Sequence, residues 1–122
     1  MAMSPAARSL QAFAFYLGAV AVTLLLAPNV LLDAFGLPRT TQVWIRVAGM
    51  VVGFLALYDW VAARTEAVAI IRLTVLTRLA APLFFLAFVT AGWVRWPLLL
   101  FGLVDLVTAL WTWRLLAGSP RR

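Results

Sequence analysis

Four ionisable residues interrupt long apolar runs in this sequence: Arg46, Asp59, Arg78 and Asp105. Carboxylate and guanidinium groups in apolar surroundings can bind a polar substrate, relay a proton or pair with one another. An ionised group at the centre of a membrane-spanning helix costs about 2.5–3.5 kcal/mol on insertion scales, so such groups usually face a partner or water. These four residues are therefore the candidate substrate-binding or ion-pair residues of the chain.

Several other chemistries lack the side chains that they need. The sequence has no cysteine and no histidine, which excludes disulfides, thiol redox chemistry, Cys or His zinc sites and histidine-ligated haem. Only four acidic residues are present, and no serine is embedded beside a base. We expect no catalytic residue, no metal and no cofactor, and a membrane enzyme acting on lipid or quinone is the least favoured function.

The composition is typical of a membrane protein. Of the 122 residues, 66% are hydrophobic and 11% are charged, and the mean hydropathy is +1.04. A water-soluble domain of this length would leave large apolar patches exposed. The net charge of +6 comes from arginines that stand mostly at the ends of apolar runs, which argues against nucleic-acid binding. The use of arginine without lysine suggests a GC-rich bacterial genome.

Four apolar runs are long enough to cross a bilayer, which takes about 20 helical residues. They cover residues 5–27, 42–63, 66–92 and 97–117, so residues 1–122 are predicted to form a single membrane domain. Local signals mark their ends: Ser4-Pro5 begins the first run, Thr65 caps the third with Glu66 in its first turn, and Gly118 ends the fourth. We predict an all-α, four-helix membrane bundle.

Tryptophan and arginine positions indicate where the membrane borders lie. The six tryptophans fall at or near the predicted helix ends, as an interfacial belt would place them, rather than in a packed core: Trp44, Trp60, Trp93, Trp96, Trp111 and Trp113. Six arginines belong to the two termini and the second loop: Arg8, Arg64, Arg72, Arg114, Arg121 and Arg122. Only Arg39, Arg46 and Arg95 belong to the other side. The positive-inside rule therefore places both termini in the cytoplasm.

The first loop holds a short apolar segment, residues 30–36, that is too short to cross the bilayer. We expect a short helix lying along the outer interface. The alternative is a re-entrant element that lines a site.

Depth in the membrane suggests how the four charges pair. Asp105 lies roughly 12 Å and Arg46 roughly 7 Å from the outer face, and both side chains lean toward it. We predict the interhelical pairs Arg46–Asp105 and Asp59–Arg78. A pair between Asp105 and Arg78 fits less well, because their depths differ by roughly 10 Å.

Proline and glycine positions suggest how the helices pack. Pro82 cannot donate to the carbonyl of Arg78, four residues earlier, so a kink is expected there. That kink is either packed on neighbouring helices or part of a hydrated polar pocket. Gly49 and Gly53 share a face with Arg46, and Gly102 shares one with Asp105. Such small residues permit close helix approach, so we expect the second and fourth spans to pack together through these faces.

Short motifs give the chain a resemblance to a known group. They are the turn Phe35-Gly36-Leu37-Pro38, the run Arg46-x2-Gly49-x3-Gly53-x4-Tyr58, the pair Arg72 and Arg78, and the run Phe101-Gly102-x2-Asp105-x3-Ala109-x-Trp111. With them the chain resembles small bacterial four-helix membrane proteins of the DoxX-like kind and related families of unknown function. The resemblance covers about residues 30–116 and implies no settled activity, so no functional residues are carried over.

The sequence thus favours an integral, multi-pass protein of the bacterial inner membrane. We expect a self-associating protein or an accessory subunit of a larger membrane complex, which contacts lipid or partner helices. The alternative is a small transporter or ligand-binding protein that handles a substrate or proton at Asp105, Arg46 and Arg78.

Overall fold

The computed structural model describes residues 3–118, and all regular secondary structure in that part of the chain is helical. The elements are α1 (Pro5–Leu26), α2 (Pro28–Ala34), α3 (Trp44–Arg64), α4 (Val68–Thr90), η1 (Trp96–Leu98) and α5 (Leu99–Ala117). Four helices are long and apolar enough to cross a membrane: α1, α3, α4 and the continuous stretch of η1 and α5. The all-α prediction is confirmed. Arg121 and Arg122, which the charge count uses, lie outside the described residues.

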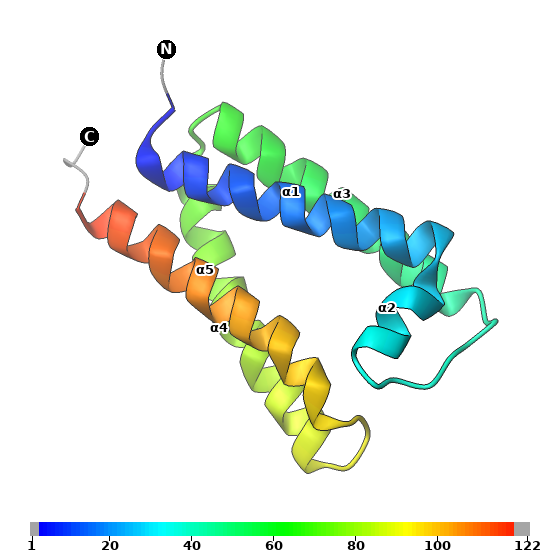
Figure 1. Ribbon diagram of the computed structural model, residues 1–122. Helices are drawn as coiled ribbons and strands as arrows, with labels where there is room; N and C mark the ends of the chain where they lie inside the picture. The colour runs from blue at the N-terminus through cyan, green and yellow to red at the C-terminus, as the bar shows by residue number, and fades with distance from the viewer. Residues whose placement is uncertain (1–2, 119–122) are drawn as a thin grey trace.

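The long helices form two pairs. α1 packs along α3, and α4 packs along α5, with further contacts between α1 and α5. Figure 1 shows the two pairs meeting near the chain termini and diverging toward the other end, where α2 and its loop lie. We call the first end the closed end and the second the open end.

A tight apolar cluster holds the closed end together. Its buried members come from α1, α3 and α4 and are mostly small, which lets the helix backbones come close: Ala6, Ala7, Leu10, Phe13, Ala62, Ala63 and Ile71. Leu115 and Leu116 of α5 pack against the same cluster. All four long helices are therefore joined at one end.

Glu66 fastens the start of α1 to the turn between α3 and α4. Its carboxylate accepts hydrogen bonds from the backbone amide of Ser4 and from the Ser4 hydroxyl, the latter at 2.8 Å. The Ser4 hydroxyl oxygen in turn accepts from the amide of Ala7 at 3.1 Å, as an N-cap should. The prediction that Thr65 caps the third span, with Glu66 in its first turn, was wrong. Thr65 ends α3, and Glu66 lies in the turn with φ +52° while its carboxylate binds the first turn of α1 instead.

Variants of the adjacent residues Glu66 and Thr65 test the hydrogen bonds between Glu66 and Ser4. We expect Glu66→Ala to lower the free energy of unfolding by about 1–2 kcal/mol, because it removes a charged acceptor from two donors at a helix N-terminus. Thermal unfolding in a mild detergent measures the change. Thr65→Ala is the control, since the Thr65 hydroxyl bonds only to Val61 of its own helix. Equal melting of the two variants would contradict the role of Glu66.

The three glycines that were expected to mediate helix packing, Gly49, Gly53 and Gly102, each lie at a contact within a helix pair. A Cβ on Gly49 would lie 2.8 Å from Leu24 Cβ and 3.2 Å from the α1 backbone, and Gly53 faces Ala21. Gly102 packs on Pro82 and Phe85 of α4. The expected packing of the second span on the fourth through these glycines was wrong, because each glycine face is already occupied by the partner helix of its own pair.

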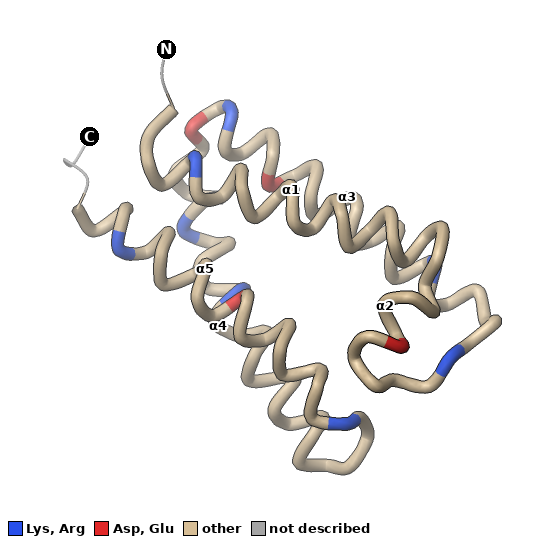
Figure 2. The backbone as a smooth tube through the Cα atoms, viewed as in Figure 1, with Lys and Arg blue, Asp and Glu red and all other residues tan. Residues whose placement is uncertain are grey.

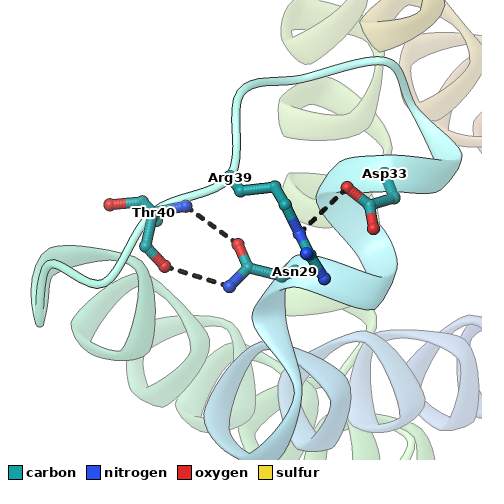
Figure 3. A network of polar contacts seen from close by, with 4 residues as sticks. All are labelled: Asn29, Asp33, Arg39 and Thr40. Atoms are coloured by element: carbon teal, nitrogen blue, oxygen red, sulfur yellow. Dashed lines mark hydrogen bonds and ion pairs between the residues drawn. The ribbon is translucent and has the colours of Figure 1, made fainter.

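The first loop closes back onto the open end. Its short helix, predicted at residues 30–36, is α2, and Phe35 directly after it stacks on Phe101 of α5 with the ring centroids 4.0 Å apart. Gly36 has φ +64° and lies against Pro97. Figure 3 shows the polar contacts that shape the loop: Asn29 exchanges two hydrogen bonds with Thr40, and Arg39 pairs with Asp33 at 3.4 Å.

The tryptophan side chains mostly face outward. Five of them expose about half or more of their surface, from 48% for Trp111 to 75% for Trp93. Trp60 is less exposed, and the ring of Phe15 and the Arg64 guanidinium lie against it. Core packing is therefore not the reason for their positions, and outward-facing rings near helix ends are what an interfacial belt requires.

Candidate functional site

Arg78 lies buried inside the helix assembly, with only 4% of its surface exposed. Its side chain leans toward the start of α4, as helix geometry dictates, and its Nε donates to the Thr74 carbonyl at 3.2 Å. Its Nη2 donates to the hydroxyls of Thr74 at 3.3 Å and Thr112 of α5 at 3.1 Å. The guanidinium also lies 4.6 Å from the ring centre of Phe13 on α1, a favourable cation–π distance.

A chain of hydroxyls continues from the arginine across to α1. Thr112 and Ser9 are fully buried, and their hydroxyl oxygens are 2.6 Å apart. The Ser9 hydroxyl donates to the Ala6 carbonyl at 2.7 Å. Because the Ser9 hydroxyl uses its one proton toward the Ala6 carbonyl, it accepts from Thr112, which is therefore the donor between the two hydroxyls. The bonds therefore run in one direction, from α4 through α5 to α1.

One nitrogen of this arginine is not satisfied. Nη1 of Arg78 is buried and has no hydrogen-bond partner among the residues that the structure describes. It is the one buried side-chain nitrogen or oxygen in residues 3–118 of which this holds. Buried donors are normally paired, and an unpaired one costs free energy, more so when it is charged.

Two carboxylates interact electrostatically with this arginine without contacting it. Asp59 of α3 is buried and Asp105 of α5 is half-buried, and both interact electrostatically with Arg78. Within residues 3–118 the only ion pair joins Arg39 to Asp33, and no hydrogen bond reaches either of the two membrane-span carboxylates. Tyr16 of α1 interacts electrostatically with Asp105. We call Asp59, Arg78 and Asp105 the charged centre; all four long helices contribute groups to it or around it.

The predicted pair Asp59–Arg78 is thus close enough to interact but not in contact. The predicted pair Arg46–Asp105 is not brought together. Arg46 is exposed and donates from Nη1 to the carbonyl of Leu25, in the last turn of α1. Terminal carbonyls lack a partner within their helix and attract cations, which explains this choice. Asp105 instead interacts electrostatically with Arg78, the partner that the depth argument disfavoured, because α5 packs on α4 and not on α3.

Pro82 lies one turn beyond Arg78 and packs on α5. A Cβ built on Gly102 would lie 3.2 Å from Pro82 Cα, and α4 continues through the proline from Val68 to Thr90. Of the two alternatives for Pro82, the described contacts correspond to a proline packed on a neighbouring helix.

The sequence reasoning missed the α1 side of the site. Ser9, Phe13 and Tyr16 stand three or four residues apart, so they share one face of α1, and that face covers Arg78 and Asp105. The spacing was available in the sequence. None of these residues is charged, so the positions of the charges do not reveal this face.

Figure 2 shows that the other charged positions lie mainly toward the ends of the long helices. The charged centre is therefore the part of this fold best equipped for chemistry, because its groups can hold a cation, share a proton or bind a polar group. Comparison with protein-family models, curated proteins and solved structures finds no match for this chain.

Proposed function

We propose that the chain is a multi-pass protein of the bacterial inner membrane that associates with itself or with partner helices of a larger membrane complex. The four long apolar helices are those of an integral membrane protein. The observation that carries the proposal of association is a groove on the α1–α3 pair.

The groove is open, has a volume of about 740 Å³, and is lined mainly by small and apolar side chains from both helices: Ala14, Phe15, Gly18, Ala19, Val22, Thr23, Gly53, Ala56, Leu57 and Trp60. Gly18 stands in the middle of α1, where a glycine weakens a helix. A Cβ at this position would meet nothing within 4 Å, so packing inside the chain does not explain it. A glycine that faces open space permits close approach of another helix.

The arrangement of arginines supports the proposed orientation, with both termini cytoplasmic. Arg8, Arg64, Arg72 and Arg114 each adjoin a residue that packs in or against the closed-end cluster, so they gather at one end of the molecule. Arg39, Arg46 and Arg95 lie toward the open end. We also propose that the chain belongs to the DoxX-like group, which the short sequence motifs between residues 30 and 116 support.

Native mass spectrometry of the gently extracted protein tests association directly. We expect a defined oligomer or a constant partner for the wild type, and loss of it for Gly18→Leu, whose side chain would fill the groove. Ala12→Leu is the matched control, since Ala12 is an exposed α1 residue outside the groove. A monomeric wild type without partners, or equal loss of association in both variants, would contradict the proposal.

The second candidate is a small transporter or ligand-binding protein, and the charged centre favours it specifically. Among residues 3–118, a buried guanidinium with an unpaired nitrogen interacts electrostatically with two carboxylates that accept no hydrogen bond. Ionisable groups at membrane depth commonly mark proton or substrate pathways. Arg46, which the sequence grouped with Asp105 and Arg78 in this role, lies apart from them and is not included.

A further inference from the structure

The groove on the α1–α3 pair leads to two polar side chains at its closed end. The two helices run antiparallel, and the rings of Phe15 and Trp60 meet across them with their centroids 5.0 Å apart. One helical turn farther toward the closed end stand Gln11 on α1 and Arg64 on α3. Residues four apart share a helix face, so Gln11 and Arg64 continue the two walls of the groove at the same level.

Neither of these side chains has a hydrogen-bond partner in the described part of the chain. Gln11 is half-buried and Arg64 is exposed. Within residues 3–118, no hydrogen bond or ion pair involves either side chain, and the Arg64 guanidinium lies 5.9 Å from the ring centre of Trp60. Amide and guanidinium N–H groups are both donors, and one carboxylate can accept from both. The closed end of the groove therefore fits an anionic oxygen group.

Gly18 indicates which kind of molecule carries that group. It lines the same groove, and a Cβ built on it would meet nothing within 4 Å. A glycine weakens a helix, and its advantage in a membrane is the close approach of a second, rigid backbone. A flexible lipid chain would fill the groove equally well beside an alanine, so lipid gives no reason for the glycine. A helix is the occupant that uses this feature.

A second copy of this chain lacks the required carboxylate. Copies of one chain insert in the same orientation when their arginines are biased to one end, so their closed ends lie at the same membrane border. The sequence has four acidic residues. Asp33 lies in α2 at the open end, and the carboxylate of Glu66 is bound by Ser4. The other two, Asp59 and Asp105, lie within α3 and α5. None of the four is free at the closed end.

We propose that the groove receives a membrane-spanning helix of a different protein, which carries an Asp or Glu side chain level with Gln11 and Arg64. The carboxylate accepts from the Gln11 amide and the Arg64 guanidinium, while the partner backbone passes close to Gly18. The inference rests on the proposed association and deepens it, because it specifies the chemistry of the partner. In this arrangement the chain is an accessory subunit and not a homo-oligomer.

Binding of synthetic helices to the full chain in neutral phosphatidylcholine vesicles tests the proposal. The probes are two labelled Leu-Ala peptides of about 22 residues, long enough to span the bilayer. Each has a central glycine, and they differ only in a Glu or Gln at the position level with Arg64. We expect fluorescence energy transfer to report about tenfold tighter binding of the Glu peptide, because a charge-assisted hydrogen bond is stronger than a neutral one.

Variants of the chain assign this preference to the groove. Arg64→Gln should bind the two peptides equally, and Gly18→Leu should weaken both alike, because its side chain fills the groove. Arg72→Gln is the matched control: it removes the same charge from an exposed α4 position outside the groove, and it should keep the tenfold preference.

Several results would overturn the proposal. They are failure of the wild type to bind either peptide, equal binding of both, and loss of the preference in Arg72→Gln as well as in Arg64→Gln. Displacement of the Glu peptide by added phosphatidylglycerol would identify an anionic lipid as the occupant. Self-pairing of the chain that excludes both peptides would identify a second copy. A homo-oligomer in the native mass spectrum would leave the proposed association in place and contradict only this inference, so the two failures are distinguishable.

Discussion

Replacing Arg78 by leucine is expected to lower the free energy of unfolding by about 3–5 kcal/mol, the cost of leaving a buried charge without its counterion. Within residues 3–118, the change removes the cation that interacts electrostatically with Asp59 and Asp105. It also removes the hydrogen bond to Thr112, the start of the hydroxyl chain to Ser9. Unfolding by a denaturing detergent, followed by circular dichroism, measures the loss.

A combined variant separates the charge effect from simple loss of packing. Arg78→Leu together with Asp59→Asn and Asp105→Asn leaves no ionised group in the centre, so we expect it to regain most of the lost stability. Arg46→Leu is the control, because Arg46 is exposed and binds a single carbonyl at the end of α1. A triple variant no more stable than Arg78→Leu alone would show that the carboxylates do not depend on the arginine.

The helices themselves were predictable because their signals are local. The described helix bounds lie within two residues of the predicted spans, and Ser4, Pro5 and Gly118 stand at the ends they were expected to mark. Glu66 was the exception. Its carboxylate accepts a hydrogen bond from the backbone amide of Ser4 at the start of α1, 62 residues away in sequence. No local sequence pattern indicates a contact over that separation.

Helix pairing was not predictable in the same way. Depth along a helix indicates which residues lie at the same level, but not which helices are neighbours. Arg46 and Asp105 have comparable depth, yet α3 pairs with α1 and α5 with α4. Arg78 and Asp105 differ in depth when all helices are taken as parallel. They nevertheless interact electrostatically, because α5 packs on α4 and the arginine side chain is long.

Gly49→Ala is expected to destabilise the fold by about 1–3 kcal/mol, the usual cost of adding volume to a tightly packed contact. The new Cβ would lie 2.8 Å from Leu24 Cβ and 3.2 Å from two backbone atoms of α1. None of these is the movable end of a flexible side chain, so α1 and α3 must separate to make room. Thermal unfolding of the purified protein measures the effect.

The other glycines turn this expectation into a graded series with a single chemical change. A Cβ on Gly102 would approach Pro82 and Phe85 to 3.2–3.3 Å, one on Gly53 would meet Ala21 at an ordinary 3.5 Å, and one on Gly18 would meet nothing. Destabilisation should therefore fall from Gly49→Ala to Gly102→Ala and vanish at Gly53→Ala. Gly18→Ala should be neutral or stabilising, since alanine is favoured over glycine in a helix by about 1 kcal/mol. If Gly18→Ala lowered the melting temperature of the monomer as much as Gly49→Ala, the α1–α3 contact would have to lie on a different face of α1.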